Sequence, residues 1–225
     1  MARSGSDFGE YDALAASWRR HLRAANKSPK TIKSYAAAAT QLRDHLESEG
    51  GPALLSALRR RHIEEFIAAL LDRTSASTAA TRYRGLQQFF KWLEEEGEIE
   101  TSPMLGMRPP KVPNQPVPVL GREDLAALLR VCEGTTFEQR RDLAILRVLI
   151  DTGLRLAEVT NLRIDDADPD RNDVDLDANT VTVVGKGGHI RVVRIGAKSV
   201  RAVDRYLRTR ARHQHTALGG VSALV

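Results

Sequence analysis

Residues 108–120 read RPPKVPNQPVPVL, and this stretch decides how the chain of 225 residues is organised. Proline fixes φ, has no backbone N–H, and biases the residue before it toward extended backbone. We therefore predict a semi-extended linker over residues 103–118, with one domain at 8–102 and another at 119–225. Six prolines lie in this linker: Pro103, Pro109, Pro110, Pro113, Pro116 and Pro118.

The segment before the linker has the apolar periodicity of helices throughout. Leu14, Trp18 and Leu22 recur at four-residue spacing, which places them on one helical face. Ser28 is a good N-cap, and Pro29 suits the first turn of the helix that follows. We predict four amphipathic helices in a compact bundle, over residues 11–25, 29–49, 60–73 and 77–96.

The segment after the linker combines helices with a small sheet. Two valine-rich runs, 181–184 and 190–195, flank a glycine turn and predict an antiparallel hairpin. The predicted fold class is therefore mainly α, with a four-helix domain followed by a smaller α+β domain. The apolar pattern predicts helices in this second domain over residues 123–132, 140–151, 156–162 and 198–213.

The composition favours a nucleic-acid partner and excludes a membrane protein. Lysine and arginine number 34 against 29 acidic residues, and the net charge of +5 favours an anionic partner. No apolar run approaches the roughly 18 residues that a membrane span needs, and the first residues lack the apolar region of a secretory signal. We predict a cytoplasmic protein with no membrane contact.

The remaining reactive side chains predict structural roles. Cys132 lies on an apolar helical stripe without an activating partner, so we predict a buried structural thiol. His213 and His215 are two residues apart, which is the wrong spacing for a metal site on one helical face. The aspartate-rich run 165–177 lacks the calcium-loop pattern and is predicted to form solvated turns. No metal site is predicted.

The sequence DTGLRLAEVTNL, residues 151–162, places an arginine at a helix junction. Gly153 ends one predicted helix and Arg155 opens the next. A guanidinium held rigidly there suits a phosphodiester with two free oxygens, and Glu158 lies on the same helical face and can orient it. The alternative is an ordinary surface Arg–Glu pair that contributes less than about 1 kcal/mol.

The sequence VGKGGH, residues 184–189, places a lysine on a glycine-rich β-turn. Lys186 at such a tip can reach a DNA groove or protonate a departing hydroxyl if its pKa falls. His189 beside it is a candidate phosphate contact. The alternative for both is a solvated turn residue, and the stretch is not a phosphate-binding P-loop, because that motif is absent.

Taken together, these motifs resemble the tyrosine recombinases, the phage integrase family. DTGLRLAE, residues 151–158, resembles the box of the family's first catalytic arginine. GKGGHIRVVRI, residues 185–195, resembles its catalytic-lysine hairpin. The region before the linker resembles its SAM-like core-binding domain, above all at SPKTIKSY, residues 28–35, which resembles the opening of a DNA-facing helix.

The resemblance implies DNA cleavage and rejoining through a tyrosine that forms a 3′-phosphotyrosyl bond, without a metal or nucleotide cofactor. Arg155 would stabilise charge on the phosphorus oxygens, Glu158 would support it, and Lys186 would protonate the leaving 5′ hydroxyl. Double-stranded DNA and other recombinase protomers, in a tetramer on DNA, are the implied partners. Four basic residues of the first domain are further candidate phosphate contacts, with a solvated helix face as the alternative: Lys30, Lys33, Arg82 and Arg84.

The sequence departs from the family pattern in its last part. None of the six histidines is followed by arginine three residues later, so the family's His-x-x-Arg box is missing. All four tyrosines precede the position where the nucleophile is expected, and Tyr206 is interpreted as a packing residue. We expect a partial catalytic domain in a chain that binds DNA without cleaving it. The alternatives are a non-catalytic DNA-binding regulator and an inactive recombinase remnant.

Overall fold

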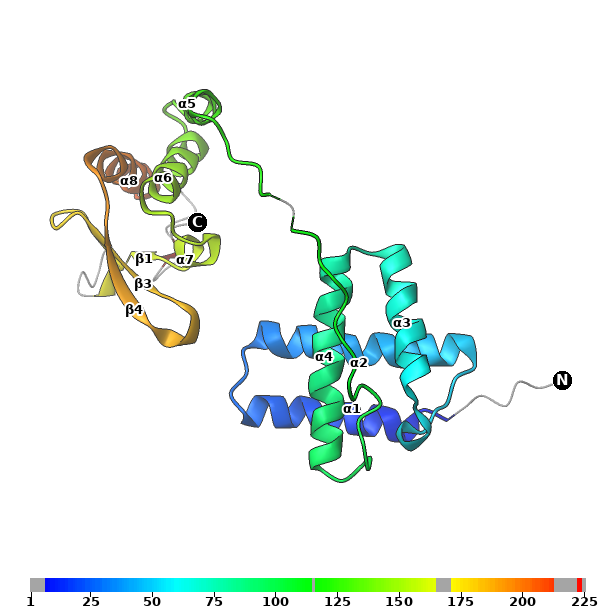
Figure 1. Ribbon diagram of the computed structural model, residues 1–225. Coiled ribbons are helices and arrows are strands. Elements are labelled where there is room, and N and C mark those ends of the chain that lie inside the picture. The colour runs from blue at the N-terminus through cyan, green and yellow to red at the C-terminus, as the bar shows by residue number, and fades with distance from the viewer. Residues whose placement is uncertain (1–6, 115, 165–170, 213–221, 224–225) are drawn as a thin grey trace. The chain divides into compact units, whose positions relative to one another are not determined.

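The computed structural model describes residues 7–114, 116–164, 171–212 and 222–223. The chain divides into two compact units, Met1–Pro116 and Val117–Val225, called unit 1 and unit 2 below. Unit 1 contains helices only, whereas unit 2 combines helices with short antiparallel strands (Figure 1). The predicted fold class is therefore confirmed.

Four α-helices and one short 3₁₀ segment build unit 1. The Ser28 side chain accepts the Thr31 N–H at 3.1 Å and begins α2, which ends at Gly50. In the same way the Ser75 side chain accepts the Thr78 N–H at 3.2 Å and begins α4. The elements are α1 (Gly9–Ala24), α2 (Pro29–Glu49), η1 (Leu55–Ala57), α3 (Arg60–Arg73) and α4 (Ala76–Glu95).

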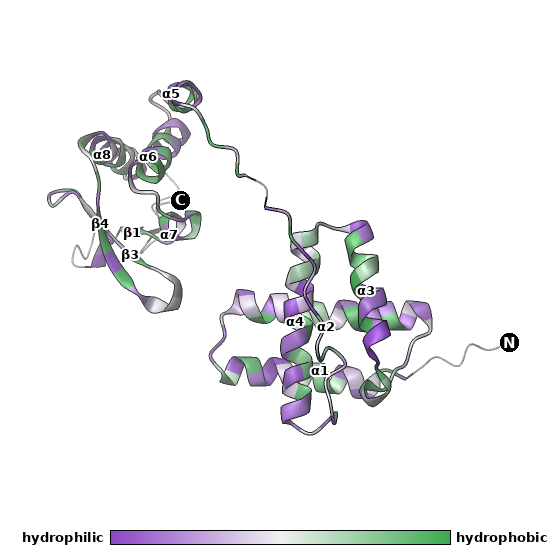
Figure 2. Cartoon of the chain, in the orientation of Figure 1, coloured by the Kyte–Doolittle hydropathy of each residue, from purple (hydrophilic) through white to green (hydrophobic). Residues whose placement is uncertain are grey.

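Aromatic side chains fill the core of unit 1. Helix α4 crosses α1 and α2 in Figure 1, and its Phe89 ring lies 4.9 Å from Trp18 and 5.8 Å from Tyr11, centroid to centroid. Phe66 of α3 is also fully buried. Hydrophobic and hydrophilic residues alternate along these helices in Figure 2, as expected for helices that bury one face. Apolar contacts among its own helices thus stabilise the bundle of unit 1.

Unit 2 packs two long helices together beside a three-stranded sheet. The sheet has the order β2-β3-β4, and all its pairs are antiparallel. Its apolar core joins α6, α7, α8 and the sheet. The helices are α5 (Arg122–Val131), α6 (Phe137–Thr152), α7 (Leu156–Thr160) and α8 (Ala197–Arg210). The strands are β1 (Arg163–Ile164), β2 (Val174–Asp175), β3 (Thr180–Val184), β4 (Ile190–Arg194) and β5 (Ser222–Ala223), and the short η3 (Lys186–Gly188) lies between β3 and β4.

Two structural predictions need correction. Cys132 is partly exposed rather than buried, because it follows the last residue of α5 and this helix buries none of its residues. The aspartate-rich run does not consist of turns alone, because Val174–Asp175 forms β2 and pairs with β3. Residues 165–170 of that run lie outside the described residues, as do His213 and His215. None of the described helices is long and apolar enough to cross a membrane.

Candidate active site

The turn before Arg155 ends α6 and fixes where the chain continues. Gly153 has φ +62°, in the left-handed region that glycine adopts without strain, and its N–H donates to the Leu149 carbonyl at 3.0 Å. Leu154 is buried in the core of unit 2, and Arg155 follows as the N-cap of α7. The main chain of Arg155 is thus held between two helices.

Glu158, in the first turn of α7, holds Arg155 at two points. Its Oε2 accepts the backbone N–H of Arg155 at 2.8 Å, and its Oε1 accepts a hydrogen bond from Arg155 NH1 at 3.0 Å. The Glu158 side chain is 5% exposed, whereas that of Arg155 is 73% exposed. The predicted Arg–Glu pair is confirmed, but it is not an ordinary surface pair, because its carboxylate is buried.

A second arginine, Arg191 on β4, binds the same carboxylate. Its NH1 donates to Oε1 of Glu158 at 3.0 Å and its NH2 donates to Oε2 at 2.8 Å, a bidentate geometry. These hydrogen bonds are the largest reason why the pKa of Glu158 is lowered to about 2, followed by the bond from the Arg155 N–H. Glu158 therefore stays anionic at neutral pH and anchors two guanidinium groups.

The hairpin of β3 and β4 carries the predicted lysine at its turn. Gly187 and Gly188 have φ +81° and +80°, and the Gly185 N–H donates to the His189 carbonyl at 2.7 Å. Lys186 begins this turn, although its side chain lies outside the described part of the structure. His189 is exposed. Because Arg191 ties this hairpin to α7, one carboxylate holds both Arg155 and the strand that follows the lysine turn.

Sequence reasoning placed Arg191 in a motif but gave it no role. The observed register supplies the missing signal, because Arg191 pairs with Val183 and Val193 pairs with Val181. Side chains that pair directly across two strands share a face, and both Val181 and Val183 are buried. The alternation of the predicted hairpin therefore already put Arg191 on the face of the buried valines, although its side chain stays 43% exposed.

Asp151, the first residue of the DTGLR motif, joins α6 to α8. Its Oδ2 accepts the backbone N–H of Gly196, the N-cap of α8, and the hydroxyl of Ser199 at 2.9 Å. A Cβ at position 196 would lie 3.1 Å from the same oxygen, so glycine allows this close approach. Because α8 follows β4 directly, Asp151 connects the end of α6, which precedes Arg155, to the segment that follows the strand of Arg191.

The basic residues predicted to contact phosphates lie on α2 and α4 of unit 1. Lys30 and Lys33 on α2 and Arg84 on α4 are exposed. Arg82 is partly buried and donates from Nε to Gln41 Oε1 at 2.8 Å, and from NH1 to a main-chain carbonyl of α2 at 3.4 Å. Arg82 therefore also braces α4 against α2, which sequence reasoning did not foresee.

Three further cations of unit 1 were missed. A groove of about 1000 Å³ along α1 and α2 is lined by Arg19, Arg23, Lys27 and Lys33, together with the acidic Asp44. Arg19, Arg23 and Lys27 recur at four-residue spacing. Arg19 and Arg23 directly follow Trp18 and Leu22 of the apolar row of α1, so the same periodicity that predicted the buried face could have found these two cations.

Three of the four tyrosines are buried in the cores of the units, and Tyr35 is partly buried against the core of unit 1. The Tyr11 hydroxyl donates to a main-chain carbonyl of α2 at 2.8 Å, and Tyr35 stacks on Trp18 with ring centroids 6.0 Å apart. Tyr83 and Tyr206 are buried, and burial raises the pKa of both, as it does for Tyr11. The interpretation of Tyr206 as a packing residue is confirmed.

Comparison with known families covers both units. Residues 14–98 match the family described as phage integrase, N-terminal SAM-like domain, and residues 118–218 match the phage integrase family. Tyrosine recombinase XerC of Chromobacterium violaceum is 31% identical over 191 residues, 85% of this chain and 60% of that protein. XerC of Oceanobacillus iheyensis is 32% identical over 184 residues, 81% of this chain and 57% of that protein. The chain thus spans less than two thirds of the length of these relatives.

Solved structures share the fold at low sequence identity. The Tn1549 transposon integrase in complex with a circular intermediate DNA has a TM-score of 0.66 and 16% identity, over 88% of this chain and 65% of that one. A lambda integrase tetramer bound to a Holliday junction also gives 0.66 and 16%, over 86% of this chain and 55% of that one. With both units matched and the fold shared, the chain belongs to the phage integrase family, the tyrosine recombinases.

Proposed function

We propose that this chain binds duplex DNA and presents part of a tyrosine-recombinase active site to a phosphodiester. The observation that carries the proposal is the buried carboxylate of Glu158, which holds the exposed guanidinium of Arg155 and, through Arg191, the hairpin of Lys186. Donors held in fixed positions are what the stabilisation of developing charge on phosphorus oxygens requires. An ordinary surface pair contributes little and has no such buried anchor.

Each residue of the site has one proposed role. Arg155 uses NH1 for Glu158, which leaves other guanidinium N–H groups for the non-bridging phosphate oxygens. Lys186 would protonate the leaving 5′ oxygen where a tyrosine other than the four of these 225 residues attacks phosphorus and forms the 3′-phosphotyrosyl bond. Glu158, with its pKa near 2, takes no proton and acts by position. His189, exposed beside the lysine turn, is a proposed phosphate contact.

Within the 225 residues, the proposed activity is binding rather than cleavage. Tyr11, Tyr83 and Tyr206 are buried, and burial opposes the anionic phenolate that attack on phosphorus needs, whereas Tyr35 is stacked on Trp18. The sequence also holds no His-x-x-Arg box to complete the set of phosphate donors. We assign DNA binding to residues 8–102 through Lys30, Lys33, Arg82 and Arg84, and the partial site to residues 119–225. The proposed setting is cytoplasmic DNA shared with other recombinase protomers.

Binding is tested with the 225-residue chain and a fluorescein-labelled duplex, by anisotropy over a salt series. Phosphate contacts make the affinity fall steeply with salt, and Arg155→Gln should reduce the slope of log Kd against log salt by about 0.9, the value for one phosphate that is no longer neutralised. Arg208→Gln is the control, because Arg208 is exposed and already paired with Asp204 at 2.6 Å. Binding that does not change with salt would contradict the proposal.

Cleavage is tested by incubating the chain with nicked duplexes that trap a phosphotyrosyl intermediate. Denaturing electrophoresis should show no covalent protein–DNA adduct. An adduct that Tyr206→Phe or another single tyrosine substitution removes would show that one of the packed tyrosines does reach phosphorus. That result would contradict the assignment of binding without cleavage.

A second candidate function is a DNA-binding regulator of a complete recombinase. The packed tyrosines favour it, because a chain that occupies a site without cutting competes with one that cuts. The test adds this chain to a recombination assay of a complete relative such as an XerC protein. Inhibition that follows the occupancy of the DNA supports regulation, and full activity at saturating occupancy rejects it.

A further inference from the structure

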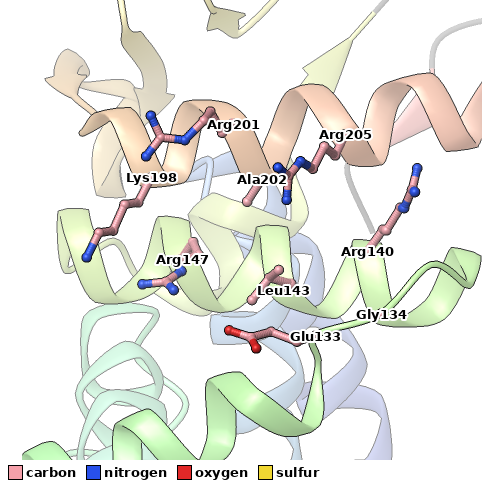
Figure 3. Close-up of a pocket in the computed structure, with 9 residues that line it drawn as sticks. All are labelled: Glu133, Gly134, Arg140, Leu143, Arg147, Lys198, Arg201, Ala202 and Arg205. Atoms are coloured by element: carbon pink, nitrogen blue, oxygen red, sulfur yellow. The ribbon is translucent and has the colours of Figure 1, made fainter.

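A second group of cations in unit 2 lies between α6 and α8, apart from the residues around Glu158 (Figure 3). The groove there has a volume of about 430 Å³. Leu143 and Ala202 are its apolar lining residues, and Glu133 is the single acidic residue in the lining. Five basic side chains line it: Arg140, Arg147, Lys198, Arg201 and Arg205.

Helical spacing puts these cations in two rows. Lys198, Arg201 and Arg205 follow one face of α8 at intervals of three and four residues, and Arg140 and Arg147 lie seven residues apart on α6. Figure 3 shows the two rows on adjacent helices. The Ser199 hydroxyl shares its one hydrogen between Asp151 Oδ2 at 2.9 Å and the Arg147 carbonyl at 3.2 Å, and so joins α8 to α6 at one end. The rows are therefore built into a rigid pair of helices.

The fold itself uses little of this charge. Arg140 NH1 donates to Thr209 Oγ1 at 2.7 Å, but no ion pair within the described ranges involves the other four cations. The carboxylates on the same helices that do form ion pairs belong to other partners: Asp142 pairs with Arg141, and Asp204 with Arg208. Like charges gathered on one surface repel each other, so this arrangement favours an anionic ligand.

We propose that the groove between α6 and α8 binds the phosphate backbone of duplex DNA, separately from the phosphodiester at Arg155. This inference rests on the proposed function. Four of the five cations are arginines, whose planar forks match phosphodiester oxygens. Contacts of these cations to phosphates would position DNA without specifying its sequence.

The double variant Arg201→Gln and Arg205→Gln tests the groove in the 225-residue chain. Both side chains are exposed, so their exchange leaves the core intact, and circular dichroism verifies the fold. With a labelled duplex of random sequence, the slope of log Kd against log salt should fall by about 0.9 for each phosphate that the variant no longer neutralises. Arg208→Gln, on the same helix but paired with Asp204, should leave the slope unchanged.

The outcomes separate this inference from the proposed function. If the unsubstituted chain binds DNA and Arg155→Gln weakens binding, but the double variant behaves like Arg208→Gln, the groove inference alone is overturned. If the unsubstituted chain fails to bind any duplex, the proposed function fails and the groove inference with it. Poly-glutamate is the alternative probe, and binding of it that the double variant abolishes while duplex affinity stays unchanged would overturn DNA as the occupant in favour of an acidic protein segment.

Discussion

Each of the two units is stabilised internally, but by different interactions. The core of unit 1 is a cluster of aromatic rings in which Phe89 contacts Trp18, Tyr11 and Phe90 at centroid distances of 4.9 to 5.8 Å. The core of unit 2 consists of small aliphatic side chains, and Tyr206 is the one buried aromatic ring among its described residues. Apolar packing therefore contributes more per residue in unit 1 than in unit 2.

Unit 2 adds two carboxylates at the junctions of its elements. Glu158 joins α7 to the hairpin, and Asp151 joins α6 to α8. Hydrogen bonds have preferred distances and angles, whereas apolar contacts are non-directional, so carboxylates position their partners more sharply. In unit 2 this sharper control acts on the guanidinium of Arg155, which the buried Glu158 carboxylate holds.

The two units also differ in how many large apolar side chains they expose. In unit 1 outside the linker 103–118, large exposed hydrophobic residues among those described are few: Leu54 and Leu71. In unit 2 outside the linker they are spread over the segment before α5, α5 itself, the end of α6, the start of α7 and the hairpin: Val119, Leu120, Leu128, Val131, Ile150, Leu156, Val184, Ile190 and Val192. Unit 2 as described thus relies more on its polar junctions.

The largest expected effect comes from the core of unit 1. Phe89→Ala removes a fully buried ring and should lower the free energy of unfolding by about 3–5 kcal/mol. Tryptophan fluorescence measures this directly, because both tryptophans, Trp18 and Trp92, lie in unit 1. Leu128→Ala on α5, which buries no residue, is the control and should change stability little. Equal effects of the two variants would contradict the contrast between the units.

A smaller effect, confined to unit 2, is expected from Glu158→Gln. The amide cannot accept all four N–H groups that the carboxylate accepts, and it leaves two guanidinium groups without their counter-charge. Far-UV circular dichroism should show an earlier thermal transition while tryptophan fluorescence keeps its midpoint. Glu123→Gln, an exposed acid on α5, is the control. An unchanged dichroism curve would show that the carboxylate is not what holds the junction.

The stability of the unsubstituted chain should depend on pH in a way that the stability of Glu158→Gln does not. Folding lowers the pKa of Glu158 from 4.5 to about 2, so its contribution to stability is fully present above pH 4.5 and is lost as the pH falls through 2. The difference in urea midpoint between the unsubstituted chain and Glu158→Gln should therefore shrink between pH 4.5 and 2. A difference that stays constant over this range would place the effect elsewhere than in the charge of Glu158.

The sequence predicted the features that depend on residues close together in the chain. The prediction of a helix over 60–73 agrees with α3, and the three-residue spacing of Arg155 and Glu158 led directly to their pair. The predicted start of α6, residue 140, is three residues late, although the signal is local. Thr136 caps the helix and Gln139 reaches back to the Thr136 N–H, a pattern readable as T-x-x-Q.

Other features depend on how distant segments meet. Arg191 and Glu158 are far apart in the chain, so their contact required the register of the hairpin and the position of α7 on it. The basic groove requires the packing of α6 on α8, because each helix alone shows only an ordinary row of cations on one face. Periodicity assigns a residue to a face, but only tertiary packing shows which other face it meets.

The smallest expected effect tests the other junction of unit 2. Asp151→Asn keeps the size of the side chain but replaces charge-assisted hydrogen bonds to Gly196 and Ser199 with neutral ones, which should cost about 1 kcal/mol. Hydrogen exchange should show faster opening of the first turn of α8, with the tryptophan signal of unit 1 unchanged. Asp177→Asn, an exposed acid before β3, is the matched control. If Asp151→Asn also weakens the DNA binding proposed for Arg155, the junction positions Arg155; if exchange changes while binding does not, Asp151 stabilises the helix pair alone.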